Sequence, residues 1–217
     1  MRTALNEAEK QLHAHEDIDS KRSGCTVNIG AVIPSSSDAF TLYSLNVGDS
    51  ECYMSIQKSH YIVEDRNINI IHSPLLPEEK CRIEKCNGTV SEHNIAPYLP
   101  HVPRVFANKE CTRGGLAMSR SIGDQLIHRY GVISEPTDET VVFSREKYAG
   151  CRILLLFGSD GFLSYLDRDK LIHDHFVNTP LQQALSIALQ SAHDHLLQQT
   201  QGKYADDASG VALSIQF

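Results

Sequence analysis

The chain has 217 residues, a formal net charge of −7, 41% hydrophobic residues and 22% charged residues. This length and composition are typical of a globular domain with a sizeable core, and the acidic balance argues against nucleic-acid binding. No apolar run approaches the roughly 20 residues that a membrane span needs. The N-terminal segment MRTALNEAEKQLHAHED is polar and acidic, unlike a secretory signal or a basic transit peptide, so we expect no membrane association and a cytoplasmic or nuclear location.

The first part of the chain is predicted to hold one helix followed by strands with short turns. Leu5, Ala8 and Leu12 recur at helical spacing, and the segments after them are rich in β-branched residues. The predicted elements are a helix at 3–17, a turn at 19–24, strands at 25–33 and 40–47 around a turn at 34–38, and a hairpin of strands at 51–57 and 61–64. This order favours an antiparallel sheet.

The second part alternates helices with strands. Pro77 precedes Glu78 and Glu79, as expected at the positive end of a helix, and the apolar run 152–157 indicates a strand that is buried on both faces. The predicted elements are a helix at 77–87, a long loop at 91–113, strands at 140–143 and 152–157, helices at 167–176 and 181–198, and a closing strand at 209–217. Together they indicate an α+β, sandwich-like architecture.

The six cysteines include no C-x-x-C pair, which argues against a structural zinc site. We expect them to be reduced and to act as small buried hydrophobes. The cysteine-phosphatase loop, the G-x-S-x-G elbow, the P-loop and the G-x-G-x-x-G fingerprint are all missing from the sequence.

One candidate for chemistry is the segment Gly158-Ser159-Asp160-Gly161, which follows the buried strand 152–157. A carboxylate at the end of such a strand is rigidly held, and carboxylate oxygens are what Mg²⁺ and Mn²⁺ prefer. The adjacent glycine lets the backbone approach a metal-bound water. An ordinary Asp-Gly turn explains the segment equally well.

Other acidic positions are Asp206 and Asp207, which precede the last predicted strand, and Asp49. Adjacent carboxylates repel one another unless they are solvated or bind a metal. Taken alone, the pair is best interpreted as a solvated turn, and Asp49 as a turn residue that caps backbone amides.

Seven short segments nevertheless occur along the chain in the same order as similar segments of one known protein family. They are Gly24-Cys25-Thr26, Asn46-Val47-Gly48-Asp49-Ser50, His72-Ser73-Pro74 with the helix after it, Gly115-Leu116-Ala117-Met118-Ser119-Arg120-Ser121-Ile122-Gly123-Asp124, Tyr130-Gly131-Val132-Ile133-Ser134-Glu135-Pro136, Ser159-Asp160-Gly161, and Asp206-Asp207. Between about residue 5 and residue 217 the chain therefore resembles the metal-dependent (type 2C, PPM-type) protein phosphatases.

The resemblance implies two antiparallel β-sheets packed as a sandwich and flanked by helices, in one domain over residues 1–217. It implies hydrolysis of phosphoserine and phosphothreonine in protein substrates, by water activated on Mg²⁺ or Mn²⁺. By position, Asp160, Asp206 and Gly161, with Asp207 beside them, would bind the metal. The resemblance assigns no other catalytic residue with certainty and no substrate-binding residue.

The sequence also departs from the family pattern. The family's Asp-Gly-His-Gly-Gly segment, with its bridging aspartate and the preceding phosphate-binding arginine, does not occur, and Ile71 and Ser164 stand where family members carry carboxylates. We therefore expect the N-terminal strands of the family domain to be missing, and this chain to be weak or inactive by itself. The alternatives are a truncated phosphatase and a pseudophosphatase that acts as a binding or scaffolding protein. Sheet edges left exposed by the missing strands would favour oligomers.

Overall fold

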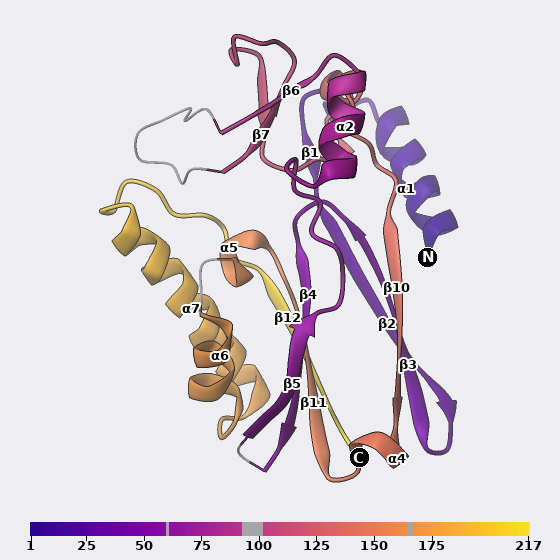
Figure 1. The fold of residues 1–217 in the computed structure, drawn as a ribbon, viewed down its shortest axis with the longest axis vertical. Helices are drawn as coiled ribbons and strands as arrows, with labels where there is room; N and C mark the ends of the chain where they lie inside the picture. The colour runs from indigo at the N-terminus through magenta and orange to yellow at the C-terminus, as the bar shows by residue number, and fades with distance from the viewer. Residues whose placement is uncertain (60, 93–101, 165–166) are drawn as a thin grey trace. The chain divides into compact units, whose positions relative to one another are not determined.

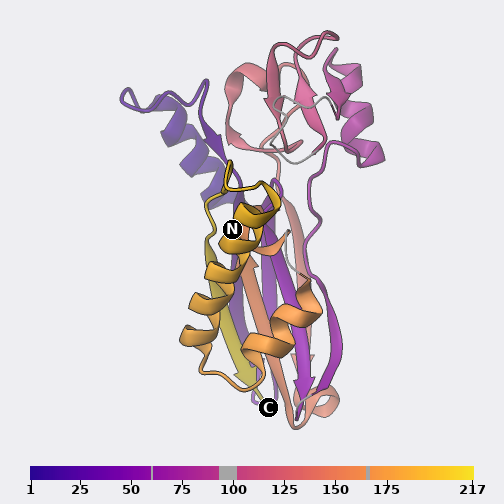
Figure 2. The same cartoon turned by 90° about the vertical axis from the view of Figure 1, so that its left-hand side faces the viewer.

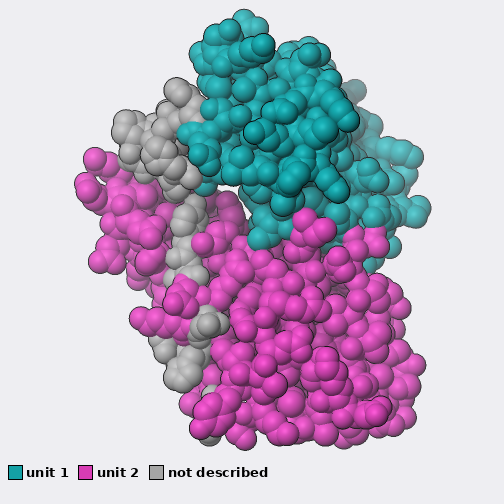
Figure 3. Space-filling model, in the orientation of Figure 1, with its two compact units in different colours: residues 1–27, 45–49, 71–137 teal, residues 28–44, 50–70, 138–217 magenta. Residues whose placement is uncertain are grey.

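A computed structural model describes residues 1–59, 61–92, 102–164 and 167–217 (Figure 1). The chain divides into two compact units, which Figure 3 colours separately. Unit 1 comprises residues 1–27, 45–49 and 71–137, and unit 2 comprises residues 28–44, 50–70 and 138–217. The single domain over residues 1–217 stays a prediction.

Unit 2 contains a four-stranded antiparallel sheet and most of a three-stranded sheet. The four-stranded sheet has the order β12 (Gly210–Gln216), β11 (Cys151–Gly158), β4 (Glu51–Lys58) and β5 (Tyr61–Asn67). The three-stranded sheet has the order β10 (Thr137–Ser144), β3 (Ala39–Val47) and β2 (Val27–Ser36). The register that matters below pairs Gly158 with Gly210 on one side and with Glu51 on the other.

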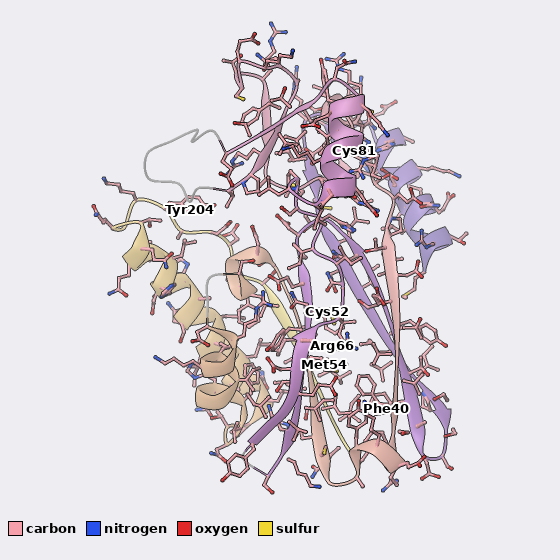
Figure 4. All side chains as sticks on the ribbon, in the orientation of Figure 1. Phe40, Cys52, Met54, Arg66, Cys81 and Tyr204 are labelled. Atoms are coloured by element: carbon pink, nitrogen blue, oxygen red, sulfur yellow. The ribbon has the colours of Figure 1, made fainter. Side chains whose placement is uncertain are left out.

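The two sheets share a core in unit 2. Phe40 from β3 and Phe143 from β10 stack with ring centroids 4.9 Å apart, and they pack in one cluster with Cys52 and Met54 from β4. Figure 4 labels Phe40, Cys52 and Met54 in this part of the molecule. Side chains from both sheets therefore form one interior, which confirms the predicted antiparallel sandwich.

Helices cover the opposite face of the four-stranded sheet (Figure 2). They are α5 (Asp160–Leu163), α6 (Arg168–Leu171) with the π-helical turn η1 (Ile172–Phe176), and α7 (Leu181–Gln199). Leu154 and Leu156 of β11 face this layer, whereas Ile153 and Leu155 face the sandwich core. The continuous apolar run of β11 thus reflects burial on both faces, as the sequence predicted.

Unit 1 is built from short elements with small cores. Its elements are α1 (Arg2–Ala14), β1 (Gly24–Cys25) paired with β9 (Ile122–Gly123), α2 (Pro77–Lys85), the three-stranded sheet β6 (Thr89–Ser91), β7 (Arg104–Phe106) and β8 (Gly114–Leu116), and α3 (Gln125–His128). Leu5 of α1 packs with Val47 and Ile122. Ile83 of α2 packs with Val105 and Ile127.

Several sequence predictions were wrong in detail. The predicted turn at 34–38 is mostly strand, because β2 continues through Pro34 to Ser36; β2 lies at the edge of its sheet, where a proline costs no ladder hydrogen bond. The predicted loop at 91–113 contains β7, and residues 93–101 of it lie outside the described residues. The helix predicted at 167–176 ends in a π-helical turn.

The cysteines also differ from the expectation, since Cys25, Cys81 and Cys86 are exposed while Cys52 and Cys151 are buried. In the part of the chain that the structure describes, no helix combines the length and the apolar character needed to cross a membrane.

Candidate metal centre

The two acidic turns that the sequence singled out lie against each other in unit 2. β11 ends at Gly158 and β12 begins opposite it at Gly210, so the antiparallel register brings the segment after one strand beside the segment before the other. The Ser159 amide donates to the Ser209 carbonyl (3.1 Å), and the Ser209 amide donates to Ser159 Oγ (3.1 Å). Ser159 Oγ in turn donates to the Asp207 carbonyl (3.3 Å). Ser159 thus fastens the two turns together.

Gly161 allows this close approach. A Cβ atom at this position would lie 2.6 Å from the Asp207 carbonyl oxygen and 3.1 Å from Asp206 Cβ. The nearest obstacle is backbone, which cannot rotate away as a flexible side chain would. The glycine predicted beside the metal position therefore has a clear structural role here, which is to let the Asp206–Asp207 turn pack on α5.

Asp160 and Asp206 interact electrostatically across this contact. Asp160 begins α5 and accepts a hydrogen bond at Oδ1 from the Gly161 amide (2.8 Å). Its partial burial, followed by the negative charge of Asp206, raises the pKa of the Asp160 carboxyl above its usual value. Asp206 Oδ1 accepts from the Asp207 amide (3.0 Å), and Asp207 itself is exposed. A cation between the two carboxylates would relieve their repulsion.

The donors present fit one weakly held hard cation and do not fit a two-metal centre. Among the described residues, no His, Cys, Asp or Glu completes a group of three that could hold a metal ion. Mg²⁺ demands six oxygen ligands in near-octahedral geometry, and with two carboxylates most of its shell stays water. Two cations held 3.5–4 Å apart, the usual spacing of a two-metal site, would repel strongly without a bridging carboxylate. These residues alone therefore do not support hydrolysis at a two-metal centre.

A buried carboxylate that sequence reasoning missed lies near this end of the sheet. Glu51 begins β4 opposite Gly158 and is 1% exposed. Its carboxylate pairs with the Arg168 guanidinium and accepts from Ser164 Oγ (3.0 Å). Arg168 also donates to Asn67 Oδ1 (2.8 Å). The available sequence signal was a charged residue at the start of a strand that carries Cys52, Met54 and Ile56, because a carboxylate buried beside such residues needs a partner.

Ser164 therefore does not offer a carboxylate at the position where the resemblance expects one; its hydroxyl is engaged by Glu51 instead. The Glu51 carboxylate is paired with the Arg168 guanidinium, so Glu51, Ser164 and Arg168 form a guanidinium–carboxylate arrangement in the interior of unit 2.

Most of the remaining family-like positions lie in unit 1, where some of them form buried polar contacts. Gly48 has a φ of +101°, a left-handed conformation that favours glycine. Its amide donates to His72 Nδ1 (3.0 Å), and its carbonyl accepts from the Asn46 side chain (3.0 Å). Asp49, beside it, is half-buried. Ile71 precedes His72 and brings no charge.

Glu79 of α2 is a buried carboxylate of unit 1 that accepts hydrogen bonds from three other side chains. It receives hydrogen bonds from Arg82 (2.8 Å), Arg120 (2.6 Å) and the Ser119 hydroxyl. Burial alone would raise its pKa, but these partners outweigh burial and hold the pKa of Glu79 well below its usual value. The sequence had placed Glu79 only as a favourable charge near a helix N-terminus.

Comparison with known proteins identifies a family for this chain. The sequence profile of the family described as "Protein phosphatase 2C" matches residues 1–206. A probable protein phosphatase 2C of Arabidopsis thaliana is 29% identical over 170 residues, covering 78% of this chain and 34% of the relative. One from Oryza sativa subsp. japonica is 30% identical over 172 residues, covering 77% of this chain and 41% of the relative.

Solved structures show the same fold. A serine-threonine phosphatase 2C from Toxoplasma gondii superimposes with a TM-score of 0.71 at 16% identity, covering 97% of this chain and 64% of that chain. A C. elegans sex determining protein superimposes with a TM-score of 0.60 at 20% identity, covering 97% of this chain and 45% of that one.

The chain spans about a third to a half of the length of the curated relatives that it matches. Within that span, the seven ordered segments, the antiparallel sandwich and the family profile agree. The chain belongs to the protein phosphatase 2C family.

Proposed function

We propose that this protein acts in the metal-dependent dephosphorylation of phosphoserine and phosphothreonine, and that residues 1–217 alone hydrolyse phosphate esters slowly or not at all. The observation that carries the proposal is the packing of the Asp160 turn on the Asp206 turn, fastened by Ser159 and permitted by Gly161. Without a cation, the electrostatic repulsion between the Asp160 and Asp206 carboxylates is unfavourable. Mg²⁺ and Mn²⁺ are the cations that such oxygens suit.

The expected weakness follows from ligand number. Two carboxylates leave a bound cation largely hydrated, so we expect affinities on the order of millimolar. A site that lacks a second cation also lacks much of the positive charge that stabilises a phosphoryl transition state, where single electrostatic contacts are worth about 3 kcal/mol.

The test is calorimetric titration of the protein with Mn²⁺ and with Mg²⁺. The comparison is between the unmodified chain, the double variant Asp160→Asn/Asp206→Asn, and Asp194→Asn, an exposed position on α7. Asparagine keeps the shape of aspartate and removes its charge. Weak heats that vanish in the double variant and persist in Asp194→Asn would support the proposal. Equal heats in all three proteins would contradict the assignment of Asp160 and Asp206.

Hydrolysis of p-nitrophenyl phosphate with and without Mn²⁺ tests the second part. A turnover in the range of about 1–10³ s⁻¹, ordinary for enzymes, would show that the two carboxylates suffice and would overturn the predicted weakness.

A second candidate function is that of a pseudophosphatase that binds partners without hydrolysing them. The observation in its favour is the Glu51–Ser164–Arg168 arrangement, in which a position expected to bear a metal-binding carboxylate is instead closed by an internal ion pair. Absence of both metal binding and hydrolysis, in a chain that is folded by circular dichroism, would favour this function over the first.

A further inference from the structure

Unit 1 contains a pocket whose lining includes none of the residues assigned to the candidate metal site. Its volume is about 450 Å³, within the usual range for ligand-binding sites. Three segments of unit 1 line it: the turn after α1, the hairpin that joins β7 to β8, and α3 with the turn that follows. The wall of this pocket, which we call the basic pocket, therefore combines residues distant in sequence.

The charge of the basic pocket is opposite to that of the chain. Lys21, Arg22, Arg113 and Arg129 line it, against a single acidic residue, Asp124. The chain as a whole carries a net charge of −7. Four cations around one concavity repel one another, and an anion bound there would relieve that repulsion.

These cations are only lightly engaged by the protein itself. Arg22 pairs with Asp19 at 3.5 Å, but both side chains are largely exposed and such pairs contribute little. The Arg129 guanidinium lies 5.0 Å from the centre of the Tyr130 ring. Among the described residues, neither Lys21 nor Arg113 takes part in an ion pair within 4.0 Å. The positive charge is thus available to a ligand.

The basic pocket also has an apolar part. Leu126 on α3 lines it and is 47% exposed, while Leu116 and the buried Ile127 lie in the same wall. A free inorganic anion would use only the cations. A peptide with an acidic group next to an apolar side chain would use both parts of the wall, burying the surface that Leu126 exposes to water.

We propose that the basic pocket binds an anionic peptide segment, held through a phosphoserine phosphate or clustered carboxylates, with a neighbouring apolar side chain against Leu126. Arginine suits both anions, because its planar guanidinium forms two parallel hydrogen bonds to a carboxylate or a phosphate. That this segment belongs to a substrate phosphoprotein rests on the proposed function; the binding itself requires no hydrolysis.

The experiment is fluorescence anisotropy at about 50 mM salt, where attraction between surface charges is weakly screened. Three fluorescein-labelled peptides share one leucine-containing sequence: one has a phosphoserine flanked by glutamates, one has glutamate in place of the phosphoserine, and one has serine with every glutamate changed to glutamine. We expect the two anionic peptides, or the phosphopeptide alone, to bind, and the neutral peptide not to bind.

Substitutions inside and outside the basic pocket test whether the peptide binds there. Arg113→Gln/Arg129→Gln should weaken binding at least about tenfold, the loss expected when charge-assisted hydrogen bonds to the anion are removed. Arg145→Gln is the matched control, because Arg145 is an exposed arginine of unit 2, outside the basic pocket. Leu126→Ala should weaken binding more modestly and leave its salt dependence unchanged.

The pattern of binding among the three peptides shows which anionic group the basic pocket recognises. Binding of both anionic peptides shows that carboxylates suffice, and binding of the phosphopeptide alone shows that phosphate is the group recognised. Equal binding of all three peptides, no binding up to about 1 mM, or an affinity unchanged in Arg113→Gln/Arg129→Gln would each overturn the proposal. Asp160→Asn/Asp206→Asn should bind the peptide normally, so a failure of the phosphatase proposal is distinguishable from a failure of this one.

Discussion

The side chain of Glu79 on α2 lies within hydrogen-bonding distance of the Arg120 guanidinium, with Arg120 Nη2 2.6 Å from Glu79 Oε1. Arg82 approaches the same carboxylate at 2.8 Å from one turn along the helix. One buried negative charge therefore holds two arginines from distant parts of unit 1, and this ion cluster determines how α2 is attached to the segment that carries Arg120.

The first prediction concerns this cluster. Glu79→Gln should lower the free energy of unfolding by about 3–5 kcal/mol, because it leaves two partly buried guanidinium groups without a counter-charge. Urea denaturation measures the loss. Glu78→Gln is the matched control, since Glu78 is the exposed neighbour on the same helix and should change stability by less than about 0.5 kcal/mol. Equal effects of the two substitutions would contradict the role given to Glu79.

The second prediction concerns pH. His72 is fully buried, and burial, followed by the charge of Arg120, lowers its pKa to about 4. His72 Nδ1 accepts a hydrogen bond from the Gly48 amide, so the neutral ring carries its proton on Nε2, 3.1 Å from Thr137 Oγ1. Protonation of Nδ1 would place two donors face to face.

The direction in which stability changes with pH follows from the difference between the pKa of His72 in the folded and unfolded states. The unfolded state binds a proton near pH 6.5 and the folded state only near pH 4, so stability falls as pH falls through this window, by at most on the order of 3 kcal/mol. The comparison protein is His72→Asn, whose side-chain oxygen keeps an acceptor for Gly48 but does not titrate. The difference in unfolding free energy between the two proteins should shift between pH 6.5 and 4 and be flat above pH 7. A flat difference throughout would mean that His72 does not titrate differently on folding.

The third prediction is that Glu51 and Arg168 are energetically coupled. Arg168→Gln should destabilise the protein by about 3–5 kcal/mol, because it leaves the buried Glu51 carboxylate without its counter-charge. Glu51→Gln/Arg168→Gln should cost less than the sum of the two single changes, with an interaction energy of about 1–3 kcal/mol in a double-mutant cycle. The exposed pair Asp38 and Arg145 provides the comparison cycle and should show less than about 1 kcal/mol. Additive losses at Glu51 and Arg168 would exclude the coupling.

The fourth prediction separates crowding from backbone strain at glycines. Gly161→Ala should destabilise the protein by about 1–3 kcal/mol, because the new methyl group meets the Asp207 carbonyl. It should also increase hydrogen exchange of the amides at 206–209. Gly150→Ala is the comparison, since Gly150 has a φ of +71° but no neighbour within 4 Å of an added Cβ. Its cost, about 1–2 kcal/mol, should come without any change at 206–209. Normal exchange at 206–209 in Gly161→Ala would show that the two turns tolerate separation.

The sequence by itself determined the local elements and the family. Helical spacing located α1, the apolar run located β11 as a strand buried on both faces, and seven short segments in order identified the phosphatase resemblance. These features are readable because periodicity and turn chemistry depend on residues a few positions apart. The sequence predicted a strand at 25–33 but missed its continuation through Pro34 to Ser36, because a proline costs little only at the edge of a sheet and the sequence does not show which strand is the edge.

Only the tertiary structure decided which charges meet. Asp160 and Asp206 lie close together because of the register between β11 and β12. Glu51 pairs with Arg168 because α6 places that arginine near the start of β4. Four basic residues of unit 1, from three separate segments, line one pocket. Electrostatic energy depends on distance and burial, and for residues far apart in the chain both are set by strand register and helix docking, which no local pattern records.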